Sequence, residues 1–387
     1  MDFYLSTTGD DAHDGTAPER AWRSMARAGR AAYSPGDRLL LQRGDRWCEP
    51  LELRGVQGAP GRPVVIGAYG EGPLPALRRT GAKGEICLLL EDCSYIEVRD
   101  LDLAEACQGL VIHLTAPQRD LSVTGCRFSR IQGLSYKGAE IDGRFFVSSA
   151  GIMVSGVWGK EPLLDGLTIR DCRSSDDCNA LWWVASMTDE QLHGDSGIYA
   201  VRNFRASDCL CEGGCFGWWI FGVQGGLIER VVATKNGISE FWAGNTAAGI
   251  EHCRDIEVKD CEFSYCNRPV FNPDGCGLDL EGGGNRGITV RNCRMALNHG
   301  AGLMLYDKGG GNRDVRIEDC NFDQNCANQL KPGGFEVVVL GHHEGLTLSG
   351  NKFRPRPGIA ALMNGNGTVT RDNRTVTYEL RPQSEVF

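Results

Sequence analysis

A pattern of alternating apolar and polar residues recurs along most of the chain. Its clearest copies alternate in this way and end in Asp, Asn or Gly followed by Cys: Leu121–Cys126, Leu167–Cys172, Ile256–Cys261, Ile288–Cys293 and Val315–Cys320. Cys261 and Cys293 are 32 residues apart (293 − 261), and Cys293 and Cys320 are 27 apart (320 − 293). A period of two predicts a β-strand with one buried face. A unit too short to bury its own apolar face, repeated at this spacing, predicts a solenoid of stacked coils.

A second type of strand follows these segments after a loop and usually begins with Gly. Its copies are Gly151–Val154, Ala180–Val184, Gly217–Phe221, Gly249–His252, Gly277–Glu281, Gly302–Tyr306 and Gly334–Val338. When they are aligned on their first residue, the second and fourth positions are mostly apolar, so the third and fifth should face outward. The third position then forms an outward column of Met153, Trp182, Trp219, Glu251, Asp279, Met304 and Glu336.

These repeats predict an all-β protein, a single right-handed parallel β-helix that comprises residues 1–387. Residues 1–50 would form the N-terminal cap and first coil, with a helix within Pro18–Ala32 over the open end. Residues 365–387 would close the other end. Further strands are expected at Arg38–Gln42, Val64–Ala68 and Thr368–Leu380.

Four longer segments interrupt the coils beside the Gly-type strands, at residues 131–149, 185–197, 236–247 and 267–276. They should gather over one face of the solenoid, and ordered loops of this length are usually functional. The Cys residues should stack at one turn, because a small and weakly polar side chain suits a narrow interior. The chain has 17 Cys and no Cys-X-X-Cys pair, so we predict reduced structural thiols.

Three acids of the outward face, Glu251, Asp279 and Glu281, are expected to cluster. Adjacent coils are about 4.8 Å apart, so the alignment makes Glu251 and Asp279 direct neighbours and sets Glu281 diagonal to Glu251 at roughly 8 Å. Like charges on neighbouring strands destabilise a sheet, which indicates a function for the cluster rather than a solvated surface. Repulsion would keep a proton on one carboxyl while another stays ionised, which supplies the acid and base of glycoside hydrolysis.

Aromatic residues near the acids are candidates for stacking on a sugar ring. Trp182 and Trp219 should be outward and Trp242 lies in a neighbouring loop, whereas Trp218 is expected to point inward. Asp274 either reaches the site or only forms the turn before Asp279.

Polar residues on the following coils complete the set of binding candidates. His299 could titrate near neutral pH, and Lys308 could bind an anionic group. Tyr306, at the fifth position of its strand, and Glu336 are the remaining candidates.

The charge and the termini exclude some classes of partner. The net charge of −9 and the lack of a basic run disfavour binding to nucleic acid. No window reaches the roughly 18 uninterrupted apolar residues of a membrane span. Met1–Thr8 lacks a basic segment followed by an apolar one, which predicts a cytoplasmic protein unless a leader has been removed. The expected partner is a carbohydrate.

Several motifs resemble bacterial parallel β-helix carbohydrate-active enzymes. The N-terminal ones are Phe3–Ser6, Asp14–Thr16, Ala21–Trp22, Pro35–Asp37 and Arg43–Asp45. Asp274–Glu281 and Asn298–Met304 are similar to the central "DGxGFDxD … HDNxGGFM" region of that group, although Glu281 replaces the commoner Asp. The group includes β-xylosidase-like and α-fucosidase-like glycoside hydrolases, with pectate-lyase-like and epimerase-like enzymes further off. The resemblance implies a catalytic role for Asp279.

The leading hypothesis is a glycoside hydrolase without a cofactor. Asp279 would be the nucleophile or base, and Glu251 or Glu281 the general acid. A polysaccharide lyase or uronate C5-epimerase is the second hypothesis, with Lys308, His299 or Tyr306 as base and Ca²⁺ held by the acids in a metal-dependent form. A non-catalytic carbohydrate-binding solenoid is the third.

Overall fold

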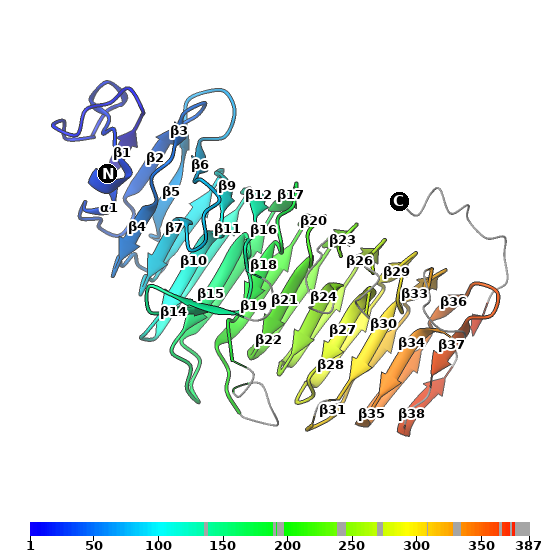
Figure 1. Cartoon of the computed structure of the whole chain (residues 1–387). Coiled ribbons are helices and arrows are strands. Elements are labelled where there is room, and N and C mark those ends of the chain that lie inside the picture. Colours follow the sequence, from blue (N-terminus) through cyan, green and yellow to red (C-terminus); the bar gives the residue numbers. More distant parts are fainter. Residues whose placement is uncertain are drawn as a thin grey trace.

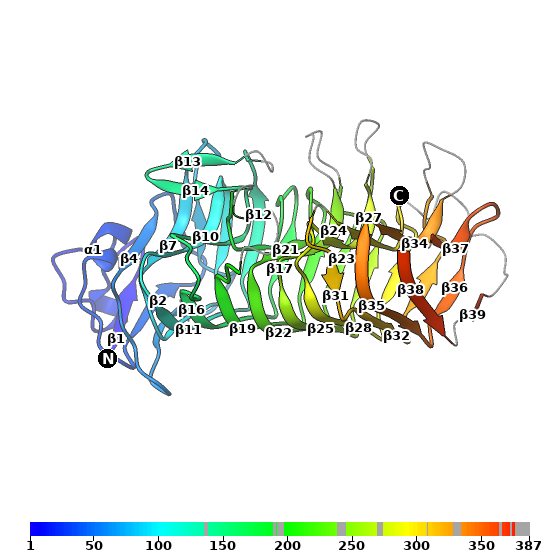
Figure 2. The same cartoon turned by 90° about the horizontal axis from the view of Figure 1, so that it is seen from below.

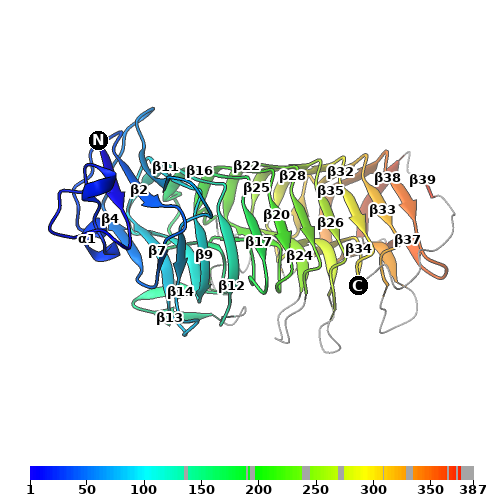
Figure 3. The ribbon, with the colours of Figure 1, turned by 90° about the horizontal axis from the view of Figure 1, so that it is seen from above.

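A computed structural model describes residues 1–134, 138–188, 191, 197–237, 245–268, 274–307, 309–327, 334–363, 366–371 and 374–375. Within them the chain winds as an elongated solenoid of parallel strands, with the N-terminal strands at one end and β38 at the other (Figure 1). Successive coils add strands to three long parallel sheets, which run side by side along the same axis (Figure 3). The predicted all-β, parallel β-helix architecture is confirmed.

Sheet A contains the segments that end in Cys. Its strands are β1 (Asp2–Leu5), β2 (Arg38–Gln42), β5 (Val64–Tyr69), β8 (Ile96–Arg99), β11 (Gln118–Thr124), β16 (Leu164–Arg170), β19 (Val201–Ser207), β22 (Val223–Glu229), β25 (Arg254–Lys259), β28 (Arg286–Arg291), β31 (Asn312–Arg313), β32 (Arg316–Glu318), β35 (His342–Ser349) and β38 (Asn366–Arg371).

Sheet B follows the turn at each Cys. Its strands are β3 (Arg46–Trp47), β6 (Ala76–Arg78), β9 (Asp102–Ala106), β12 (Arg127–Ile131), β17 (Arg173–Ser175), β20 (Leu210–Glu212), β23 (Val232–Thr234), β26 (Glu262–Ser264), β29 (Arg294–Ala296), β33 (Asn321–Asp323), β36 (Lys352–Arg354) and β39 (Arg374–Thr375).

Sheet C contains the Gly-type strands and therefore the predicted site. Its strands are β4 (Leu51–Arg54), β7 (Ile86–Glu91), β10 (Gln108–Leu114), β15 (Ile152–Gly156), β18 (Trp182–Val184), β21 (Trp218–Phe221), β24 (Thr246–Glu251), β27 (Cys276–Glu281), β30 (Leu303–Tyr306), β34 (Phe335–Leu340) and β37 (Ala360–Met363). An antiparallel hairpin of β13 (Ala139–Ile141) and β14 (Arg144–Phe146) is inserted between β12 and β15 and lies over the N-terminal part of sheet C (Figure 2).

The turn from sheet A to sheet B explains why Asp or Asn precedes Cys in the repeat. Asp171, Asp260 and Asn292 have φ values of 54°, 55° and 50°, a left-handed conformation that these residue types tolerate better than most. The Cys residues at these turns are buried and form no disulfides: Cys126, Cys172, Cys209, Cys261, Cys293 and Cys320. The predicted stack of buried Cys residues is confirmed.

The N-terminal cap contains less helix than the sequence indicates. A 3₁₀ turn, η1 (Pro18–Arg20), and a short helix, α1 (Met25–Gly29), replace the expected helix within Pro18–Ala32. The chain between them is extended because Trp22 N donates to Tyr4 O at 2.9 Å and so joins β1. Of the predicted closing strand at Thr368–Leu380, β38 and β39 cover the first residues, and residues 376–387 lie outside the described part.

Candidate active site

The register between β24 and β27 decides which acids are neighbours. Asp279 is opposite Gly249 on one side and Met304 on the other, whereas Glu251 is opposite Glu281. The expected pairing of Glu251 with Asp279 is wrong by two residues. A shift of two residues keeps every side chain on its face of the sheet. The three acids therefore share the outer face of sheet C, with Glu251 beside Glu281 and Asp279 diagonal to Glu251.

The error in register has a local cause. The sequence pattern predicts that this strand begins at Gly249, but β24 begins at Thr246. Because Ala248 is opposite Leu278, the residue that corresponds to Gly277 is Ala247. A strand begins where its backbone forms hydrogen bonds with the neighbouring coil. The position of a Gly in the sequence does not predict where these hydrogen bonds begin.

Two glycines make room for large side chains on this face. A Cβ at Gly282 would collide with the carboxylate of Glu251, which lies against this residue of the next coil. A Cβ at Gly249 would collide with the indole of Trp219, which lies across β24 towards Asp279. Glu251 and Asp279 are each only 2% exposed, while Glu281 is partly exposed. The acids therefore form a mostly covered site that opens towards Glu281.

Trp182 does not belong to the outer face. Its ring stacks on Trp218 with centroids 5.6 Å apart, and the pair packs between Phe204 and Phe263 in the interior. The outward position predicted for Trp182 is wrong, and the inward position of Trp218 is confirmed. Strand β18 has the sequence Trp-Trp-Val, in which no polar residue marks the outer face. The sequence therefore does not show which of Trp182 and Trp183 points outward.

The outward aromatic residues are Trp183, Trp219 and Phe221. Trp183 and Trp219 stack at 5.5 Å, and Phe221 stacks on Trp219 at 5.7 Å. Phe221 lies opposite Glu251, so the aromatic group adjoins the acids. Trp219 is only 1% exposed, so it packs beside the acids on the outer face and is not the open sugar platform that the sequence predicts. The sequence pattern does not predict outward positions for Trp183 and Phe221, because Trp183 is next to another Trp and Phe221 ends its strand.

A corner with His299 and Asp274 borders the site. His299 Nδ1 accepts a hydrogen bond from Arg268 N at 3.1 Å, and burial lowers the pKa of His299 to about 4, which leaves it neutral at pH 7. Burial, together with the charges of Asp279 and Asp274, raises the pKa of the Cys276 thiol. Both carboxylates therefore lie within electrostatic range of one thiol, so Asp274 belongs to the surroundings of the acids. The rest of its predicted turn lies outside the described residues.

Glu336 does not lie in the outward column. Val338 is opposite Met304 there, and Glu336 sits at the corner between sheets B and C, where its Oε2 accepts from Asn325 Nδ2 at 2.5 Å. Glu336 is fully buried, and burial raises its pKa to about 8. Its predicted outward position is wrong, because a strand that turns a corner no longer alternates strictly.

The last candidates divide between the outer face and undescribed segments. Leu280 is opposite Leu305, so Tyr306 takes the position after Glu281 in the column, and it is 36% exposed. Trp242 and Lys308 lie outside the described residues. Within the described ranges no group of three or more His, Cys, Asp or Glu side chains could hold a metal ion. The helices of the same ranges are too short to cross a membrane.

The family and the relatives of the chain agree with this architecture. The model of the family described as "Right handed beta helix region" matches residues 82–375. A lacto-N-biosidase from Bifidobacterium longum subsp. longum is 29% identical over 127 residues, which cover 26% of this chain and 8% of that protein. The chain thus matches only a small part of this curated relative.

Two solved structures share the fold at low identity. The GH136 lacto-N-biosidase from Eubacterium ramulus superposes with a TM-score of 0.71 at 16% identity, covering 97% of this chain and 68% of that one. An alginate lyase from Paenibacillus sp. str. FPU-7 superposes with a TM-score of 0.57 at 12% identity, covering 95% of this chain and 99% of that one. The resemblance to β-helix carbohydrate-active enzymes is confirmed in the fold.

Proposed function

The chain belongs to the right-handed β-helix family, and we propose that it is a glycoside hydrolase that uses the carboxyl groups of Glu251, Asp279 and Glu281. The register of β24 and β27 carries the proposal, because it brings three acids together on one face. Like charges on adjacent strands cost stability, and paired carboxyls are what glycosidic cleavage requires. The match to a lacto-N-biosidase supports the same reaction class.

The carboxyls would divide the acid and base roles. Glu251 or Glu281 donates a proton to the glycosidic oxygen, and the bond from that oxygen to the anomeric carbon breaks. Asp279 either attacks the anomeric carbon or takes a proton from the water that attacks it. The buried aromatic group of Trp183, Trp219 and Phe221 packs beside the acids on the same face and excludes water from that side of the site.

Product stereochemistry separates the two roles proposed for Asp279. In retaining enzymes the second carboxylate attacks the anomeric carbon and water then hydrolyses the covalent intermediate, whereas in inverting enzymes it activates the attacking water. Retention of configuration, followed by ¹H NMR of the fresh product, would indicate that Asp279 is the nucleophile, and inversion that Asp279 is the base.

The first test is turnover by Asp279→Asn. We propose an aryl glycoside of lacto-N-biose as first substrate, followed by neutral oligosaccharides. We expect turnover to fall about 10²–10⁴-fold, the usual effect of losing an acid–base or nucleophilic group. The melting temperature should not fall, because Asn has nearly the same shape as Asp and carries no charge to repel the neighbouring acids. Asp171→Asn is the matched control, since Asp171 is 56% exposed on a turn after sheet A. Near-normal activity of Asp279→Asn would contradict the proposal.

Elimination or C5 epimerisation of a uronate is the second candidate. Exposed Tyr306 follows Glu281 on the next coil and could take the proton next to a uronate carboxylate. Arg254 and Arg286 pair on adjacent coils just after the acids and could bind that carboxylate. Formation of an unsaturated uronate, seen by its ultraviolet absorbance, would favour the lyase. Inhibition by chelators would favour a Ca²⁺-dependent form of the enzyme. A sugar that binds but is never converted would favour a binding solenoid.

A further inference from the structure

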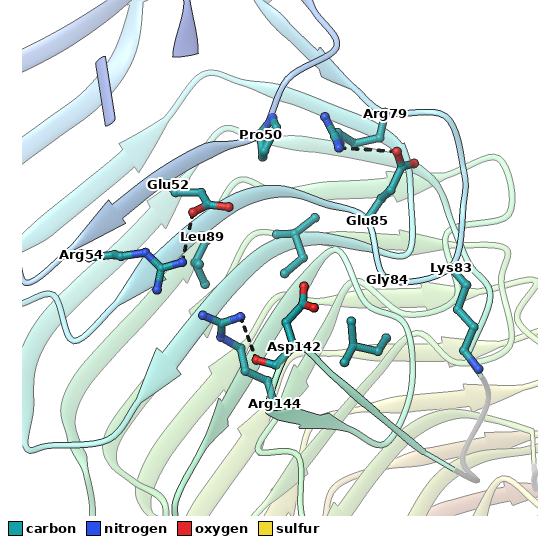
Figure 4. Close-up of a pocket in the computed structure, with 12 residues that line it drawn as sticks. Pro50, Glu52, Arg54, Arg79, Lys83, Gly84, Glu85, Leu89, Asp142 and Arg144 are labelled. Atoms are coloured by element: carbon teal, nitrogen blue, oxygen red, sulfur yellow. Dashed lines mark hydrogen bonds and ion pairs between the residues drawn. The ribbon is translucent and has the colours of Figure 1, made fainter. Parts of the chain in front are cut away.

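A hollow lies at the N-terminal end of sheet C, apart from the three acids. It is a cleft of about 560 Å³. Strands β4 and β7 form its floor, the segment from Arg79 to Glu85 forms one wall, and the hairpin of β13 and β14 forms the other (Figure 4). Its size is within the range of about 300–1,000 Å³ that is typical of ligand sites.

The cleft is separate from the candidate active site. Strands β10, β15, β18 and β21 lie between β7 and β24 in sheet C. Five steps of about 4.8 Å put the cleft roughly 24 Å from the acids along the axis. The outer-face side chains between them are buried, among them His113, Met153, Trp183 and Phe221. A ligand in the cleft therefore occupies its own site and does not extend the one at Asp279.

The hairpin wall is held in place at several points. Arg144 forms an ion pair with Glu91 of β7. Ile141 packs on Gly84, where an added Cβ would lie 3.0 Å from its Cγ2. At the base of the hairpin, Val147 N donates to Ser186 Oγ at 2.7 Å. The cleft is therefore preformed, which lowers the entropic cost of binding.

The charges around the cleft balance. The cationic side chains are Arg54, Arg79, Lys83 and Arg144, and the acidic ones are Glu52, Glu85 and Asp142, with Glu91 beneath them. Such a lining has no strong field to attract an anion or a cation. It offers N–H donors and carboxylate acceptors side by side, which suits a neutral ligand rich in hydroxyl groups.

The polar groups are positioned and still available. Arg54 binds Glu91 at 2.6 Å and Glu52 at 3.0 Å, and its side chain is 49% exposed. A guanidinium has five N–H donors, so donors remain for a ligand after these contacts. Leu89 and Ile141 add apolar surface between the charged groups. A pyranose ring matches this arrangement, with hydroxyls at its edge and C–H groups on its face.

Two carboxyls of the cleft, Glu85 and Glu91, are kept ionised by their partners. Burial would raise the pKa of Glu85, but hydrogen bonds from Thr80 and Ala82 and the charge of Arg79 bring it below its ordinary value. Burial would also raise the pKa of Glu91, but its contacts with Arg144 and Arg54 bring this pKa below its ordinary value. Both are ionised at neutral pH, so neither can donate the proton that a leaving sugar oxygen needs.

We propose that this cleft binds a neutral segment of a carbohydrate chain, a short run of sugar rings, without cleaving it. The inference takes its ligand class from the proposed function and adds a second, non-catalytic site. Tethering a glycan here would raise its local concentration near the acids of the same sheet face.

The test is saturation-transfer NMR with lacto-N-biose, cellobiose and xylobiose as neutral probes and digalacturonate as a charged one. We expect transfer to at least one neutral disaccharide, and about tenfold weaker binding in Arg54→Ala, the usual effect of losing a charged hydrogen-bond donor. Lys83→Ala, at an exposed position on the rim, should also weaken binding. Arg170→Ala is the matched control, because Arg170 is 57% exposed at the end of β16 in sheet A.

Glu281→Gln separates the two sites. Transfer that survives in Glu281→Gln and falls in Arg54→Ala supports the cleft. Loss in Glu281→Gln alone, no transfer to any neutral disaccharide, or transfer to digalacturonate only would each overturn the inference. Turnover of the aryl glycoside is measured separately, so binding at the cleft without turnover would refute the hydrolase and leave the cleft site standing.

Discussion

At the scale of single residues, Gly282 leaves the space that the carboxylate of Glu251 occupies. Its φ of 79° disfavours any other residue, and the carboxylate of Glu251 occupies the place of its missing Cβ. We predict that Gly282→Ala lowers the melting temperature and reduces turnover, because the strained backbone costs about 1–2 kcal/mol and the Glu251 carboxylate must move as well. Thermal denaturation and the glycoside assay measure the two effects.

Gly44→Ala is the matched control for this variant. Gly44 has a φ of 86°, and no atom lies within 4 Å of the place where its Cβ would be. It should show the backbone penalty alone and normal turnover. Equal losses of stability in the two variants would mean that the Glu251 contact adds nothing.

At the scale of secondary-structure elements, the corner between sheets B and C depends on a buried acid. Burial raises the pKa of Glu336 to about 8, well above its value in an unfolded chain, so the folded state holds a proton that the unfolded state loses near pH 4–5. Stability from this group is therefore complete at acidic pH and is lost as the pH rises towards 8. We predict that Glu336→Gln removes this loss. The difference in melting temperature between the variant and the wild type should then shift in favour of the variant as the pH rises from 5 to 8.

Parallel pH profiles for the two proteins would contradict this prediction. Asp323→Asn tests a neighbour, because the charge of Asp323 also raises the pKa of Glu336. Removing that charge should weaken the pH dependence without abolishing it.

At the scale of the whole molecule, the stacked Cys residues report on the integrity of the solenoid. Cys48 is the exposed one of the 17, and burial raises the pKa of interior thiols such as Cys253 to about 12. We predict that Ellman's reagent modifies one thiol in the native protein and all 17 in guanidinium chloride. Cys48→Ser should abolish the native reaction, whereas several reactive thiols in that variant would mean that coils open in solution.

Much of the fold follows from the sequence because its signals are local and repeated. Alternation at a period of two, with Asp or Asn before Cys, fixes the sheet A strands and the turn that follows them wherever the coils stack. The same alternation assigned Glu251, Asp279 and Glu281 to the outer face correctly, because a slip of two residues leaves the face unchanged.

The tertiary structure decided what depends on contacts between coils. Hydrogen bonds between β24 and β27 paired Glu251 with Glu281 rather than with Asp279. Packing, and not periodicity, chose Trp183 over Trp182 for the outer face and turned Glu336 into the corner. The cleft between the hairpin of β13 and β14 and the segment from Arg79 to Glu85 is lined by residues between 50 and 144 that share no local pattern. Periodicity thus determined which face a residue takes, and only the contacts between coils determined its neighbours.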